Sequence, residues 1–205
     1  MKNKLFIITL IASILVFSGS SLAAAGYWQQ HYEEAELKYN ENPESMANNY
    51  YKAIAMANLG MVTEVMEILD KFEDEFSKDE FVGVFTQEIE DIDEDKDELL
   101  YLNYHAFYHV IFDEYEEAIR YFDKIIDKDS GNIWPINYRS LLLIELERYD
   151  EASETLDKSL AIQSNQYTYF LMALKHYEQG QNFRALNELR KTGSFLFRMF
   201  AGYIN

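Results

Sequence analysis

Two histidines, His105 and His109, have the spacing that comes closest to a metal site in this chain. Side chains four residues apart on a helix share one face, as zinc ligands can. Yet the chain has no cysteine, no Glu-x-x-His pattern surrounds the pair, and only His31 and His176 remain as further histidines. His109 and His176 also occupy equivalent positions in a repeated pattern, which favours a packing role. The sequence therefore predicts no metal site.

An acidic run at residues 90–98 contains alternating aspartates, as calcium-binding loops do. Lys96 stands where such a loop needs glycine, and Leu102 stands where a bidentate glutamate should close the coordination shell. Acidic residues before a helix suit the positive end of its dipole, so the run is expected to be a solvated helix start. Neither a Gly-x-Ser-x-Gly phrase nor a glycine-rich phosphate loop occurs. We therefore expect no catalytic residues, no cofactor and no enzyme activity.

The N-terminus has the pattern of a secretory signal peptide. Residues 5–17 form an uncharged apolar run after two lysines, and residues 18–25 are rich in small side chains. Ala23 and Ala25 form an Ala-x-Ala cleavage site, so the signal peptide is expected to span residues 1–25. The sequence thus predicts an exported protein that is secreted, periplasmic or associated with the cell envelope. Retention of the run as a short anchor is the alternative.

Composition limits the partners of the remaining chain, residues 26–205. They are enough for one domain, and without cysteine that domain must be held together by packing alone. The formal net charge of the whole chain is −18, and removal of Lys2 and Lys4 would make it more negative. Such a body repels nucleic acid and anionic lipid. We expect neither nucleic-acid binding nor membrane insertion after signal cleavage.

A repeated phrase predicts the fold class. Tyr115-Glu-Glu-Ala118 and Tyr149-Asp-Glu-Ala152 lie 34 residues apart, which is the period of a helical repeat array. Two prolines and eight glycines interrupt the helical pattern little, so the class is all-α. The expected helix pairs span 46–59 with 62–76, 99–112 with 115–127, 133–146 with 149–162, and 166–179 with 182–191. Their turn residues are Gly60, Asp113, Glu147 and Gly180.

Three segments fall outside these pairs. Residues 28–42 are expected to form a lone helix before the first pair. An extra segment at about 78–98 has amphipathic spacing, which indicates either an extra helix or a degenerate half repeat. An apolar C-terminal helix is expected to cap the last pair, although it could also make a homo-oligomer. Its apolar residues are Phe195, Leu196, Phe197, Met199, Phe200, Tyr203 and Ile204.

Small residues at the expected helix crossings carry a resemblance to a known family. Close crossing of two helices needs a small side chain. The first helices have Ala53, Ala106, Ser140 and Ala173, and the second helices have Val65, Ala118, Ala152 and Ala185. This pattern resembles the tetratricopeptide repeat family, which implies a right-handed α-solenoid of helix-turn-helix repeats with a C-terminal capping helix. Two pairs depart from the pattern: the first has Val62 in place of Tyr115 and Tyr149, and the fourth has Asn182 there with Phe183 one position later.

The resemblance implies a non-enzymatic adaptor or scaffold that binds a peptide or a protein helix in its concave face. Carried onto this chain, the partner-binding residues would be Tyr50, Asn103, Phe107, Trp134, Asn137, Tyr167 and Phe170. Replacing Trp134 and Tyr167 together by alanine should abolish partner capture, while helical content and melting stay nearly unchanged. The alternative function is a self-assembling envelope component that uses apolar terminal helices, one beginning near Trp28 and one near Phe195.

Overall fold

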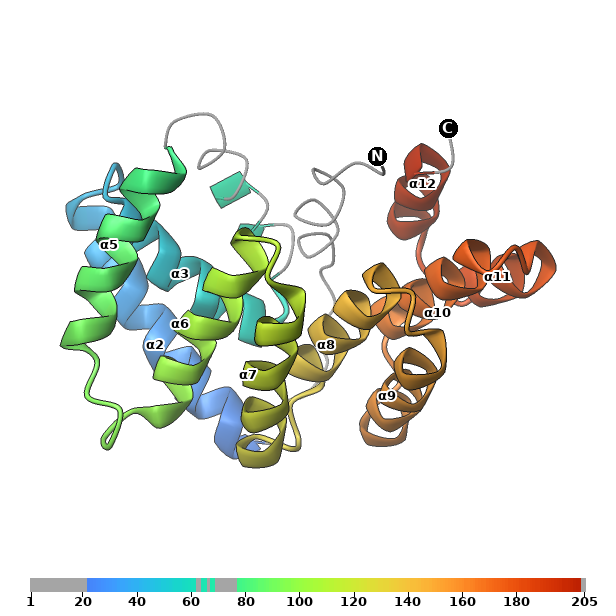
Figure 1. The fold of residues 1–205 in the computed structure, drawn as a ribbon, viewed down its shortest axis with the longest axis horizontal. Helices are drawn as coiled ribbons and strands as arrows, with labels where there is room; N and C mark the ends of the chain where they lie inside the picture. The colour runs from blue at the N-terminus through green and yellow to red at the C-terminus, as the bar shows by residue number, and fades with distance from the viewer. Residues whose placement is uncertain (1–21, 62–63, 66, 69–76, 204–205) are drawn as a thin grey trace.

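The structure is a computed structural model, and it describes residues 22–61, 64–65, 67–68 and 77–203. The described residues form an all-α solenoid of helix pairs, with α8 running between the N-terminal and C-terminal helices (Figure 1). The helices are α2 (Leu22–Glu41), α3 (Met46–Leu59), α5 (Lys78–Asp91), α6 (Glu98–Ile111), α7 (Tyr115–Lys128), α8 (Ile133–Glu145), α9 (Tyr149–Ile162), α10 (Gln166–Glu178), α11 (Asn182–Leu189) and α12 (Ser194–Tyr203).

The last three helix pairs match the predicted boundaries within two residues. Polar side chains define several of these starts by accepting a backbone N–H of the first turn. Asn132 accepts from the Trp134 N–H at 3.1 Å, and Asn165 accepts from the Tyr167 N–H at 2.7 Å. The second helix predicted for the first pair, at residues 62–76, lies mostly outside the described residues.

The four predicted turn residues share one conformation. Gly60, Asp113, Glu147 and Gly180 all have positive φ, between 59° and 75°. In each turn the next residue donates its N–H to the carbonyl five positions earlier, at 2.8–2.9 Å. This geometry closes the end of a helix. The four turns therefore share one geometry, although only two of them use glycine.

Small residues lie at the helix crossings, as the repeat predicts. Helices α6 and α7, α8 and α9, and α10 and α11 pack as pairs, while α7 contacts α8 and α9 contacts α10. Bulky residues four positions after the second-helix set are also buried where they are described, namely Phe122, Leu156 and Leu189. The buried small residues are Ala53, Ala106, Ser140 and Ala173 on first helices and Val65, Ala118, Ala152 and Ala185 on second helices.

The two ends of the array are closed differently. At the C-terminus, α12 packs on α10 and buries Leu196 and Phe200, which agrees with the predicted capping helix. At the N-terminus, α2 packs on α3 and buries Trp28 completely. Helix α5, in the predicted extra segment, packs Phe81 and Phe85 against Tyr50 of α3.

The predicted signal peptide lies largely outside the described residues, except that residues 22–25 belong to the start of α2. Its cleavage stays a prediction. Among the helices that the structure describes, none is long and apolar enough to cross a membrane.

Candidate interaction surfaces

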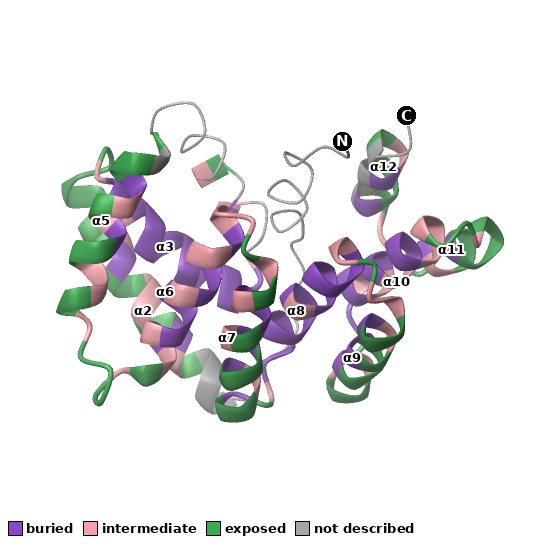
Figure 2. Cartoon of the chain, viewed as in Figure 1, coloured by how far each residue is buried: buried purple, intermediate pink, exposed green. Residues whose placement is uncertain are grey.

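All seven residues predicted to bind a partner are buried. Their exposed fractions run from 0 to 8%, and helix α8, which carries two of them, is buried along most of its length (Figure 2). The expectation of an open aromatic face is therefore wrong for this structure. Contact of these residues with a partner stays a prediction. They are Tyr50 2%, Asn103 0%, Phe107 8%, Trp134 1%, Asn137 0%, Tyr167 0% and Phe170 0%.

The aromatic members of this set join neighbouring helices. Tyr50 of α3 donates its hydroxyl to the Tyr104 carbonyl oxygen of α6 at 2.6 Å. The Trp134 ring lies 5.8 Å from that of Tyr167, which in turn stacks on Phe170 at 6.2 Å. These rings connect α8 with α10, so their first role is structural.

Asn103 has both ends of its amide paired within the fold. Its Nδ2 donates to the Leu99 carbonyl at 2.9 Å, and its Oδ1 accepts from Asn58 Nδ2 at 2.8 Å. Asn132 extends this buried network from Asn58 toward Asp129, whose carboxylate it contacts at 3.1 Å. Burial raises the pKa of Asp129. Both the oxygen and the nitrogen of the Asn103 amide are therefore engaged within the fold.

Asn137 differs, because one end of its amide is unpaired. Its Oδ1 accepts hydrogen bonds from Ser159 Oγ at 2.9 Å and from Thr168 Oγ1 at 3.2 Å. Its Nδ2 is buried and has no hydrogen-bond partner. Turning the amide over would leave the oxygen unpaired instead. Either way, one hydrogen-bonding group on α8 is unused.

The two equivalent histidines contact equivalent residues. His109 Nδ1 lies 2.6 Å from Glu114 Oε2, and His176 Nδ1 lies 3.0 Å from Gln181 Oε1. Each partner stands five residues later, immediately before the second helix of its pair. These two histidines therefore pack by contacting a side chain on the other side of the hairpin turn. Burial, followed by the charge of Lys175, lowers the pKa of His176.

His105 lies in an aromatic cluster. Its ring is parallel to that of Tyr121 within 7° at 4.8 Å, and it also contacts Tyr101 at 4.6 Å. Burial, then the charges of His109 and Lys124, lowers its pKa to about 4. The part of the chain that the structure describes contains no group of three or more His, Asp or Glu side chains that could hold a metal ion.

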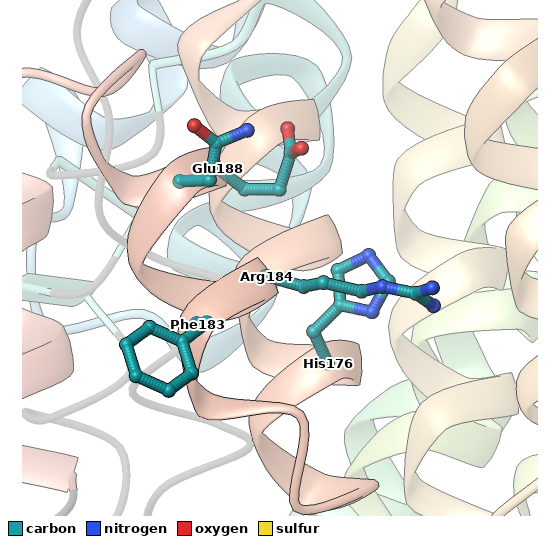
Figure 3. A pocket seen from close by; sticks show the side chains of 5 residues that line it. His176, Phe183, Arg184 and Glu188 are labelled. Carbon is teal, nitrogen blue, oxygen red and sulfur yellow. The ribbon is translucent and has the colours of Figure 1, made fainter.

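An open pocket of about 600 Å³ lies between α10 and α11 (Figure 3). Arg184 donates from Nη1 to Gln181 Oε1 at 3.0 Å, while Glu188 pairs with Lys191 at 2.7 Å. Phe183 is 93% exposed. The pocket is lined by His176, Phe183, Arg184, Asn187 and Glu188.

Exposed apolar side chains gather on the last helices. Of the described large apolar residues that are exposed, Phe183, Leu186 and Phe197 belong to α11 and α12, and the others are Leu37 and Ile162. In the sequence, Phe183 stands out only because it lies one position after the place that Tyr115 and Tyr149 occupy in their pairs. The signal that pointed to this surface was the departure of the fourth pair from the pattern of the others.

The molecule is thus a repeat protein of stacked helix pairs. It is similar to the crystal structure of TTC0263, a thermophilic TPR protein in Thermus thermophilus, with 14% sequence identity and a TM-score of 0.47. That match covers 98% of this chain and 97% of the other. No family model and no curated protein matches the sequence.

Proposed function

We propose that this protein is a non-enzymatic interaction module that holds a peptide or a protein helix along the face of its first helices. The observation that supports this function best is the unpaired amide end of Asn137. It lies on the first helix of the third pair, three residues after Trp134 and therefore on the same side of α8.

An unpaired buried amide lowers stability by about 1–3 kcal/mol, and a ligand that makes the missing hydrogen bond would recover this free energy. A peptide backbone supplies the missing partner, because it offers a carbonyl oxygen and an N–H at every residue. The amide is buried in the free protein, and a partner reaches it only after the groups that cover it move. Binding would therefore be coupled to a local rearrangement of this face.

Replacing Asn137 by leucine tests this role. The substitution removes the amide, while Ser159 Oγ and Thr168 Oγ1, which lie 3.1 Å apart, can still pair with each other. We expect the free energy of unfolding to change by less than about 1 kcal/mol, because an unsatisfied group is lost together with its bonds. Capture of partners from an envelope extract, with the protein as bait, should fall to background.

Lys158→Ala, an exposed substitution on α9, is the matched control and should capture the same partners as the unchanged protein. Equal capture by Asn137→Leu and this control would exclude Asn137 from the binding site.

The predicted signal peptide supports placing this module outside the cytoplasm. The intact mass of the protein isolated from the producing cell distinguishes a chain that begins at Gly26 from one that keeps residues 1–25 as an anchor.

The alternative function is self-assembly through apolar terminal helices. At the N-terminal end Trp28 is fully buried, whereas Leu37 on α2 is 67% exposed. Phe197 on α12 is 47% exposed and is available for contact. A concentration-dependent mass in light scattering is the result this alternative requires.

A further inference from the structure

We propose that the exposed surface of α11 is a second docking surface, separate from the first-helix face, and that it binds an acidic protein segment that carries apolar side chains. The residues that define it are Phe183, Arg184, Leu186 and Arg190. We refer to these four as the α11 surface. All four are exposed.

The repeats themselves provide the comparison that supports this surface. The two positions before the small crossing residue are Glu116 and Glu117 in α7, and Asp150 and Glu151 in α9. In α11 the same two positions are Phe183 and Arg184. Five residues after the crossing residue, Asp123 and Asp157 are replaced by Arg190. At three equivalent positions, acidic residues thus give way to one aromatic residue and two arginines.

Folding does not require this change. Glu116, Asp123, Asp150, Glu151 and Asp157 are exposed, and Glu117 is partly exposed. The same positions in α11 are exposed as well. Since carboxylates serve these positions in two repeats, packing gives no reason for Phe183 or Arg190. Phe183 is 93% exposed and Leu186, on the same helix, is 41% exposed, so the two form an apolar patch of the kind that marks a contact surface.

The local chemistry selects the partner. Phe183 and Leu186 are three residues apart and share a face of α11, so they offer apolar contact to one side of a bound segment. Arg184 uses Nη1 for Gln181, and its remaining N–H groups can take a carboxylate in the pocket, where Asn187 adds a second donor. Glu188 also lines the pocket, and its ion pair with Lys191 at 2.7 Å offsets part of its negative charge.

The overall charge favours a short acidic segment over an extended anion. At physiological salt, charges act over about 8 Å, so a short segment meets mainly the cations of this end of the chain. Nucleic acid or an anionic membrane would also meet the rest of a chain whose net charge is −18. A second copy of this chain carries the same negative charge, so self-association is disfavoured for the same reason.

A peptide titration tests the proposal. The probe is a fluorescein-labelled peptide of about 12 residues built from glutamate and leucine, a length that covers one helix face. One reference peptide has lysine in place of glutamate, and another has serine in place of leucine. Fluorescence anisotropy should show that the full-length protein binds the glutamate–leucine peptide at least about tenfold more tightly than either reference. Added salt should weaken this binding.

The matched variant gives α11 the residues of α9, through Phe183→Asp, Arg184→Glu and Arg190→Asp. Because α9 already has these residues at exposed positions, melting should be unchanged, while binding should fall at least about tenfold. The control variant, Lys124→Glu with Lys158→Glu, removes exposed cations from α7 and α9 and should bind as the unchanged protein does. The Asn137→Leu variant should also bind the probe as the unchanged protein does. The titration therefore tests the α11 surface independently of the proposed first-helix site.

Several results would overturn the proposal. Equal binding by the α11 variant and the unchanged protein would exclude this surface, and equal binding of all three peptides would exclude acidic-apolar recognition. Tighter binding to phosphatidylglycerol vesicles than to the peptide would identify a lipid headgroup as the ligand. Light scattering that shows oligomers of the unchanged protein, absent from the α11 variant, would identify a second copy as the occupant.

Discussion

Replacing Trp134 by alanine is expected to lower the free energy of unfolding by about 3–5 kcal/mol, the usual loss for removing a buried aromatic side chain. Trp134 is 1% exposed and lies where α3, α8 and α10 meet. Its ring packs against Tyr138 within α8 and against Tyr167 of α10. Alanine would leave a cavity at this junction. Urea denaturation followed by circular dichroism measures the loss.

Phe183→Ala is the control for this substitution, because Phe183 is an aromatic side chain that is almost fully exposed. Its removal should change the free energy of unfolding by no more than about 0.5 kcal/mol. A loss of less than about 1 kcal/mol for Trp134→Ala would mean that the ring does not hold the three helices together. Such a small loss would contradict the buried junction described above.

Replacing Gly60 by alanine is expected to destabilise the protein by about 3 kcal/mol, from two separate causes. Gly60 has a φ of 75°, which L side chains rarely adopt. A methyl group added there would also overlap the indole ring of Trp134. Gly180 has nearly the same φ, 73°, but an added methyl would meet nothing within 4 Å. Gly180→Ala should therefore lose only the backbone contribution, about 1 kcal/mol.

The difference between the two glycine variants measures the contact of Gly60 with Trp134. In a Trp134→Phe background the ring is smaller, so the loss caused by Gly60→Ala should decrease, whereas the loss caused by Gly180→Ala should not change. Equal losses for the two glycine variants in the unchanged protein would show that Trp134 does not approach this turn closely.

The repeat pattern was sufficient to predict the last three helix pairs. Ala118 and Ala152 repeat with the period of the fold, and each must be small for a local reason, namely the close approach of two helices. The same local logic placed the turns at Asp113 and Glu147, although neither is glycine. Features that recur along the chain and depend on neighbouring residues are therefore accessible to sequence reasoning.

The repeat pattern did not predict which residues surround an individual side chain. Asn103 was expected to face a ligand, but it pairs with Asn58, which is 45 residues away. Tyr50 was expected in an open face, but α5 from the extra segment packs against it. Both outcomes depend on how non-repeated parts of the chain pack, and the repeat period carries no information about that.

The α11 surface is an intermediate case. Phe183 and Arg184 could be recognised from the sequence by comparing α11 with α7 and α9, because the repeats are aligned by their crossing alanines. What the sequence lacked was exposure, since an apolar residue that departs from a pattern can equally be buried against a cap. The structure removes this ambiguity, because α12 buries Leu196 and Phe200 but leaves Phe183 uncovered.

The central claim, that the pairs stack through small residues at their crossings, is tested most directly by one substitution at two positions of α9. Ala152 is fully buried at a crossing, whereas Ala161 in the same helix is exposed. Ala152→Leu should lower the free energy of unfolding by about 1–3 kcal/mol through overpacking, and Ala161→Leu should change it by less than about 0.5 kcal/mol. Equal stability of the two variants in urea denaturation would contradict the stacking described above.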